Sequence, residues 1–160
     1  MANVRMTRID YRMIHGQVVA KWIKVCPVKR IVLVDDVLGA DDFMSAIYKT
    51  AVPRGTDVDI IREAEIQETL DSMDDTVFLI FKDVASAYRA FQAGTKFGVL
   101  VVGAVPNAPD RQLITSGVAL SEKELDMLEE MEKGGEEVKI QPIPESAAIS
   151  LSTAEKKIKR

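Results

Sequence analysis

The amino-acid sequence predicts a single-domain α/β fold, built as an open and mostly parallel β-sheet with helices on both faces. Short β-branched runs alternate with amphipathic segments along the chain, which is the pattern of right-handed βαβ units. Two of these runs, Arg30–Asp35 and Thr76–Phe81, are apolar nearly throughout rather than at every second position. Strands that are buried on both faces of a parallel sheet have this composition. The length of 160 residues favours one domain over 1–160.

Seven runs are predicted as strands of this sheet. In chain order they are Val4–Asp10, Arg30–Asp35, Val58–Ile61, Thr76–Phe81, Phe97–Val102, Val118–Leu120 and Val138–Ile143.

Helices are predicted between the strands by apolar residues at i, i+3, i+4 and i+7. One such stripe contains Met44, Ile47, Tyr48 and Ala51, and another contains Val84, Ala87, Tyr88 and Phe91. Asp41 stands where it can cap the first of these helices, and Gly94 stands where the second would end. Ser121-Glu-Lys-Glu124 is a capping-box pattern that opens an acidic helix. Residues 144–160 are expected to form a basic tail or a short terminal helix.

Composition excludes several classes of protein. Hydrophobic residues make up 47% and charged residues 29% of the chain, which does not fit a disordered or disulfide-stapled protein. No apolar run approaches the ~20 residues that cross a bilayer, and the N-terminus does not have the pattern of a signal peptide. A net charge of −4 does not favour nucleic-acid binding. One cysteine and one histidine do not make a zinc site. We therefore expect a cytosolic protein without a metal.

The loop after the first predicted strand has the most informative chemistry. It reads Arg8-Ile-Asp10-Tyr-Arg12-Met-Ile-His15-Gly-Gln-Val18 and contains the single histidine, His15. In an open α/β sheet, ligands bind beyond the carboxyl ends of the strands. The start of the following helix offers unpaired N–H groups to a phosphoryl group, and arginines supply planar donors for phosphate oxygens. The loop therefore has the parts of a phosphohistidine site, in which imidazole is the nucleophile.

Taken residue by residue, this loop also allows a purely structural interpretation. His15 could pack or cap the helix, and Arg8 and Arg12 could be solvated charges. Most histidines are not nucleophiles, so the residue types alone favour the structural interpretation.

The complete loop resembles the phosphorylation-site motif of the IIB subunits of bacterial sugar phosphotransferase systems, in the mannose/fructose/sorbose family. The similarity continues through Lys21-Trp22, through the strand Arg30-Ile-Val-Leu-Val-Asp-Asp36 and through Val118–Glu124. It covers about residues 1–143. The resemblance implies an open sheet with one antiparallel edge strand, for which Val138–Ile143 is the candidate.

The resemblance also implies a function and a set of site residues. His15 would accept phosphate from the phosphohistidine of a IIA partner and pass it to a sugar held by a membrane IIC/IID complex. Arg8 and Arg12 match the arginines of the motif, and Asp10, Gly16 and Gln17 match its polar and glycine positions. The sugar would be mannose, fructose, sorbose or an amino sugar. The chain would need no cofactor, and it would lie in the cytoplasm beside the membrane transporter.

The sequence departs from the family pattern in two places. Met13 stands where leucine is usual, which conserves volume. After the fifth strand the family usually has Asn-Val-Gly-Gly, whereas this chain has Val101-Val-Gly-Ala104. The second departure concerns the rim of the site, and so the sugar preference and the geometry of the partners.

Two alternatives compete with this interpretation. In a receiver-like signalling domain, Asp35-Asp36 would bind Mg²⁺ and Asp83 would be the phosphoacceptor. That alternative leaves the histidine loop unexplained. A nucleotide-binding enzyme is suggested by the fold class alone, because the chain has no Gly-x-Gly-x-x-Gly or Walker A pattern.

Overall fold

The computed structural model describes residues 1–158. Its strands are β1 (Asn3–Asp10), β2 (Arg30–Val34), β3 (Asp57–Ile61), β4 (Thr76–Phe81), β5 (Val99–Ala104), β6 (Gln112–Thr115), β7 (Val118–Leu120) and β8 (Glu137–Ile140). Its helices are α1 (Gly16–Val25), α2 (Asp36–Gly39), α3 (Asp42–Lys49), α4 (Ile66–Asp71), α5 (Val84–Gln92), α6 (Glu122–Lys133) and α7 (Leu151–Ile158), with a 3₁₀ turn, η1 (Glu63–Glu65), before α4.

Six of the strands form one parallel sheet in the order β3-β2-β4-β1-β5-β8. Strands β1 and β4 are in the middle of this sheet, and the side chains of β2, β4 and β5 are buried along most of their length. The predicted fold class, a mostly parallel α/β sheet, is therefore confirmed.

Two details of the predicted sheet are wrong. The run predicted as an antiparallel edge strand, Val138–Ile143, forms β8 and pairs parallel with β5. Helix α6 lies between β7 and β8 and carries the chain back across the sheet, and a crossover of this kind produces parallel pairing. The run Val118–Leu120 is β7, which belongs to a separate antiparallel hairpin with the unpredicted strand β6. The hairpin follows β5 in the chain.

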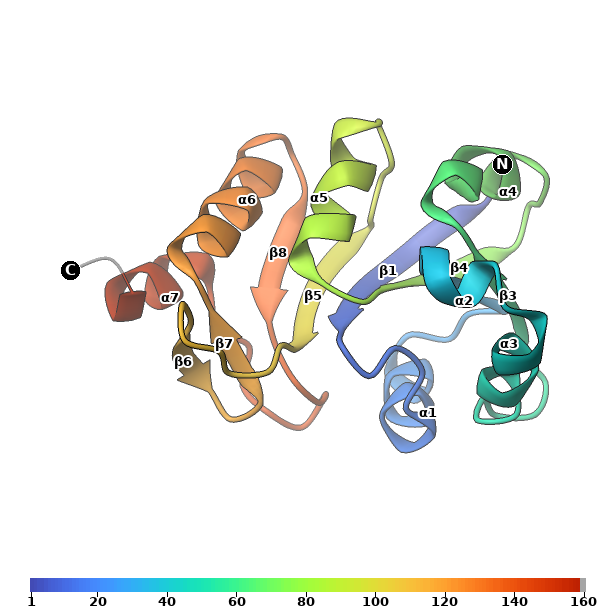
Figure 1. Cartoon of the computed structure of the whole chain (residues 1–160), viewed down its shortest axis with the longest axis horizontal. Coiled ribbons are helices and arrows are strands. Elements are labelled where there is room, and N and C mark those ends of the chain that lie inside the picture. Colours follow the sequence, from blue (N-terminus) through green and yellow to red (C-terminus); the bar gives the residue numbers. More distant parts are fainter. Residues whose placement is uncertain (159–160) are drawn as a thin grey trace.

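Helices cover the sheet on both sides (Figure 1). One face packs against α4, α5, α6 and α7, and its core includes Phe81, Leu100 and Leu125. The other face packs against α1, α2 and α3, and its core includes Trp22, Leu33 and Phe78. Because both faces are covered, the strands are apolar throughout rather than alternating.

The predicted helix ends are where the sequence signals placed them. Asp41 accepts a hydrogen bond from Met44 N, and Ser121 and Glu124 form a reciprocal capping box at the start of α6. Gly94 has a φ of 98°, a left-handed conformation that glycine adopts without strain. The stripe on α3 differs from the prediction, because Met44 and Ile47 are exposed.

The end of the chain forms helix α7 rather than a solvated tail. Leu151, Ala154 and Ile158 are buried against the sheet, and Lys157 Nζ donates a hydrogen bond to Ile114 O at 2.7 Å. The last two residues of the predicted basic tail, 159–160, lie outside the described residues. The rest of this segment is part of the packed structure.

Candidate active site

The site lies at the carboxyl end of β1, in the loop that leads to α1 near the middle of the sheet (Figure 1). A tight turn follows Asp10, in which Met13 N donates to Asp10 O at 2.9 Å. Met13 has a φ of 64°, which is uncommon for a residue with a side chain and is found at strained functional loops. The turn directs the chain into α1 immediately after the strand, so His15 lies just beyond the carboxyl end of β1.

His15 is the N-cap residue of α1, and its side chain is exposed. Its carbonyl accepts from Val19 N at 3.0 Å, whereas its imidazole makes no capping hydrogen bond. The histidine therefore neither packs in the core nor caps the helix, which were the structural interpretations that its sequence position left open. Its ring is accessible beside the unpaired N–H groups at the start of α1.

Asp10 and Arg12, in the loop that leads to His15, form a bidentate ion pair. Arg12 Nε donates to Asp10 Oδ1 and Arg12 Nη2 donates to Asp10 Oδ2, both at 3.1 Å. The backbone N of Arg12 also donates to Oδ1, at 2.9 Å. These hydrogen bonds raise the pKa of the Arg12 guanidinium, so it remains charged. The Arg12 side chain is still 35% exposed, which leaves its outer N–H groups available to an anion.

Arg8, which the motif places among the site residues, is almost completely buried, and its guanidinium does not reach the surface at which a phosphoryl group would bind. Its side chain is 1% exposed and lies beneath the loop, 5.8 Å from the ring centroid of Trp22. Desolvation lowers the pKa of the Arg8 guanidinium, and Asp10 opposes this effect by accepting from Arg8 Nε at 3.3 Å. Its guanidinium lies against Asp10, Gln141 and Trp22, and the spacing of residues in the sequence could not reveal these contacts. Of the two arginines in the motif, only Arg12 is accessible at the site.

Gly16 has a packing role that the sequence did not indicate. A Cβ on this residue would lie 2.6 Å from Ala51 O, just after α3. A glycine at the start of a helix also allows an anion to approach the backbone closely, because it has no Cβ. In the structure, the absence of a side chain lets the first turn of α1 contact the end of α3. The neighbouring Gln17 is exposed on the first turn of α1.

A hollow of about 410 Å³ opens beside the histidine loop. Its walls come from the loop itself, from the segment after β5, from the hairpin and from the segment after β8. They include Tyr11, Arg12, Val105, Leu113 and Ile143. Tyr11 and Leu113 are exposed, so an apolar surface with one cationic side chain borders the site.

The acidic residues of the receiver-like alternative are occupied in capping helices and loops. Asp35 accepts from Leu38 N at 3.0 Å, and Asp83 accepts from Ser86 N at 2.8 Å. Asp36 accepts from Glu63 N at 2.8 Å. Asp35 and Asp83 therefore cap the starts of α2 and α5, and Asp36 holds the start of η1.

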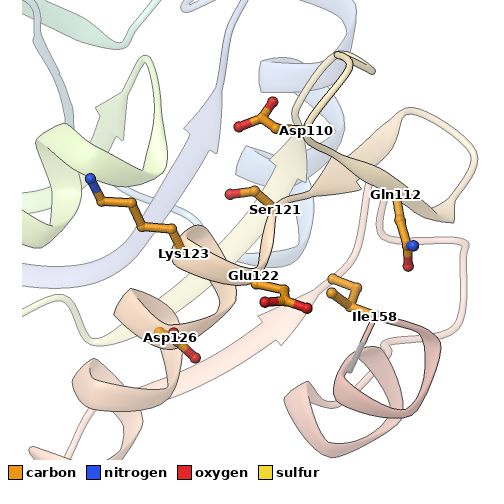
Figure 2. A pocket seen from close by; sticks show the side chains of 7 residues that line it. All are labelled: Asp110, Gln112, Ser121, Glu122, Lys123, Asp126 and Ile158. Atoms are coloured by element: carbon orange, nitrogen blue, oxygen red, sulfur yellow. The ribbon is translucent and has the colours of Figure 1, made fainter. Parts of the chain in front are cut away.

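A second hollow, of about 510 Å³, lies between the hairpin, α6 and α7 (Figure 2). Carboxylates of Asp110, Glu122 and Asp126 border it, and Ile158 closes one side. In residues 1–158, no three His, Cys, Asp or Glu side chains are grouped so that they could hold a metal ion. No helix in the same range has the length and apolar character needed to span a membrane.

Comparisons with known proteins show the family to which the chain belongs. Residues 4–159 match the family described as PTS system sorbose subfamily IIB component. The chain is 23% identical over 152 residues to the sorbose-specific EIIB component of Klebsiella pneumoniae, covering 93% of each protein. It is 24% identical over 151 residues to the fructose-specific EIIB component of Bacillus subtilis (strain 168), covering 92% of this chain and 93% of that protein.

Among solved structures, the chain resembles that of manxB from Thermoanaerobacter tengcongensis. The two are 35% identical with a TM-score of 0.93, and the match covers 100% of this chain and 99% of the other. The family match extends through α7, beyond the part of the sequence in which the motif and strands carried the resemblance. The chain thus belongs to the sorbose-subfamily IIB components of the phosphotransferase system, phosphotransferases that carry phosphoryl groups in sugar uptake.

Proposed function

We propose that His15 accepts a phosphoryl group from the phosphohistidine of a IIA protein and passes it to a sugar bound by a membrane IIC/IID complex. The observation that carries this proposal is the position of His15. Its imidazole is exposed at the N-cap of α1 without a capping bond, and the partly exposed guanidinium of Arg12 belongs to the same short loop, three residues earlier in the chain.

In the first step, the unprotonated ring nitrogen of His15 attacks phosphorus and forms an N–P bond. The N–P bond of the donor breaks, and its electron pair returns to the donor imidazole. In the second step, a sugar hydroxyl attacks phosphorus and forms an O–P bond, and the N–P bond of His15 breaks with its electron pair returning to the imidazole. The hydroxyl proton passes to solvent or to that imidazole.

Arg12 stabilises the charge on the transferred group. Its Nε and Nη2 are used on one edge by Asp10, which leaves the opposite edge, formed by Nη1 and the second N–H of Nη2, for two phosphoryl oxygens. In phosphoryl transfer the equatorial oxygens carry most of the negative charge, so a planar fork held in place lowers the barrier. Asp10 orients Arg12, and Gly16 and Gln17 form the helix start next to the phosphoryl group.

The apolar hollow beside the loop suits a protein partner rather than a free sugar. Valine, leucine, isoleucine and proline side chains predominate in its walls, whereas sugar hydroxyls need polar groups. We assign this surface to docking of the IIA donor, which must bring its phosphohistidine in line with His15. Residues 1–160 would then form one IIB domain at the cytoplasmic side of the transporter, serving a sugar such as mannose, fructose, sorbose or an amino sugar.

The proposal is tested by incubating the chain with radiolabelled phosphoenolpyruvate, the general phosphotransferase proteins and a IIA protein of this subfamily. The label should map to His15 and should be lost in acid but retained in base, because phosphohistidine is acid-labile. A label that is lost in base instead would point to an aspartyl phosphate and refute the proposal. Adding membranes with the matching IIC/IID complex and its sugar should then move the label to the sugar.

A further inference from the structure

Arg8 is held in a space that exists because residue 103 is glycine. A Cβ built on Gly103 would lie within 2.5 Å of Cζ, Nη1 and Nη2 of Arg8. Gly103 is in β5 where the pairing with β1 changes register, between Ile9 opposite Val102 and Asp10 opposite Ala104. Bulges of this kind often occur next to active sites, where they change the direction of a side chain. The absence of a side chain at Gly103 therefore decides where the Arg8 guanidinium lies.

The buried guanidinium of Arg8 depends on few partners. Its Nη1 donates to Gln141 O at 3.4 Å, its Nε donates to Asp10 Oδ2 at 3.3 Å, and its Nη2 makes no hydrogen bond. A buried charge that lost its counter-ion would be strongly destabilised, so Arg8 and Asp10 hold each other in place. Asp10 is 2% exposed and is correspondingly restricted.

The Asp10 carboxylate joins Arg8 to Arg12. Its Oδ2 accepts from both guanidinium groups, and its Oδ1 accepts from the Nε and the backbone N of Arg12. If the carboxylate rotates, it cannot keep its hydrogen bonds to both Arg8 and Arg12. The position of Arg8 therefore sets the plane of the carboxylate, and that plane sets the direction of the Arg12 fork.

We propose that Gly103 and Arg8 are positioning residues for phosphoryl transfer, which act on His15 only through Asp10 and Arg12. This inference rests on the proposed function of His15 and Arg12. It assigns Gly103 a specific task, because any side chain there would displace the Arg8 guanidinium. Neither residue contacts the phosphoryl group itself.

The test uses Gly103→Ala in the full chain. The φ of Gly103 is not in the left-handed region, so alanine needs only space and the flexible end of Arg8 is what must move. Gly134→Ala is the matched control, because its Cβ would lie 2.5 Å from Phe91 Cζ at the end of α6, away from the histidine loop. Phosphorylation is measured in single turnovers over a range of concentrations of phosphorylated IIA protein up to saturation, together with a melting curve and the NMR signal of the Arg12 Nε–H group.

We expect Gly103→Ala to slow phosphorylation of the folded protein by about 10- to 100-fold, since a misplacement near 1 Å has this effect. The Arg12 Nε–H signal should shift, while half-saturation by the IIA protein stays the same. Gly134→Ala should lower only the melting temperature. In an Arg12→Ala background, Gly103→Ala should slow the reaction by no more than about two-fold, because Gly103 affects the reaction only through the position of the Arg12 side chain.

Two results would overturn the inference. One is a folded Gly103→Ala variant with the wild-type rate and an unchanged Arg12 Nε–H signal. The other is an undiminished effect of Gly103→Ala in the Arg12→Ala background, which would mean that Gly103 acts independently of Arg12. Failure of the proposed function would look different, because the wild-type chain would then carry no phosphate on His15, while the NMR signal would still report the position of Arg12.

Discussion

Asp10 and Arg12 are joined edge to edge, with Nε and Nη2 of the guanidinium each 3.1 Å from one oxygen of the carboxylate. The same carboxylate neutralises the buried Arg8, so a single acidic side chain serves one arginine inside the fold and one at the surface. Arg8 therefore has a structural role and Arg12 a chemical role, while Asp10 supports both. We expect substitutions of these three residues to have different effects.

Replacing Asp10 with asparagine should destabilise the fold. The variant keeps the shape of the side chain but leaves the Arg8 charge buried without a counter-ion, which costs about 3 kcal/mol. For a chain of this size, the melting temperature should fall by roughly 6–12 °C. Asp59→Asn is the control, because Arg30 keeps Asp57 and Asp75 as partners, and there the change should stay below about 1 kcal/mol. Equal melting curves for the two variants would show that Asp10 does not compensate Arg8.

Replacing Arg12 should affect the reaction more than the fold. Arg12→Ala should slow phosphorylation of His15 by about 10²–10³, the effect of removing a donor that stabilises developing charge. Arg12→Lys should retain part of the rate, because an ammonium supplies charge but not the planar fork. Asp10 keeps Arg8 as a partner in both variants, so melting temperatures should fall by about 4 °C at most. An unchanged single-turnover rate for Arg12→Ala would make Arg12 a solvated charge.

Replacing Gly16 with alanine should affect the fold and the reaction together. The new Cβ would press on the carbonyl of Ala51, and backbone cannot move aside as a side chain can. Overpacking of this kind costs about 1–3 kcal/mol and displaces the first turn of α1, which begins beside His15. Lys24→Ala, on an exposed position of the same helix, should change stability by no more than about 0.5 kcal/mol. A wild-type melting temperature for Gly16→Ala would show that α1 and α3 are free to separate.

The stability of the chain should depend on α7. Leu151→Ala removes a buried side chain, at a cost of about 2–5 kcal/mol, and the melting temperature should fall by at least about 4 °C. Lys156→Ala on the exposed side of the same helix should have almost no effect. Both variants should accept phosphate on His15 at the wild-type rate, since α7 is remote from the histidine loop (Figure 1). If both variants had the melting temperature of the wild type, α7 would be dispensable for the stability of the fold.

Much of the fold could be predicted because local patterns report burial directly. Runs such as Thr76–Phe81 are apolar because both faces of the sheet are covered, and Ser121 with Glu124 marks a helix start through bonds within one turn. The direction of β8 could not be predicted in this way. Its composition is that of an edge strand of either direction, and the parallel pairing results from the path of α6 across the sheet.

The site was predictable as a set of residues but not as an arrangement. The sequence brought Arg8, Asp10, Arg12 and His15 together because they are close along the chain. It did not distinguish the buried arginine from the accessible one, because that depends on the space at Gly103 in a strand more than ninety residues away. The packing of Gly16 on Ala51 is a contact of the same non-local kind. For the burial of Arg8, the signal in the sequence was the glycine at position 103.

The central claim, that His15 carries the phosphoryl group, is tested most directly by comparing the wild-type chain with His15→Ala in IIA-dependent labelling. We expect one phosphate per wild-type chain and none in the variant. Because the imidazole is exposed and makes no capping bond, the variant should melt within about 2 °C of the wild type. A folded His15→Ala chain that still accepts phosphate from the IIA protein would show that His15 is not the phosphoryl acceptor.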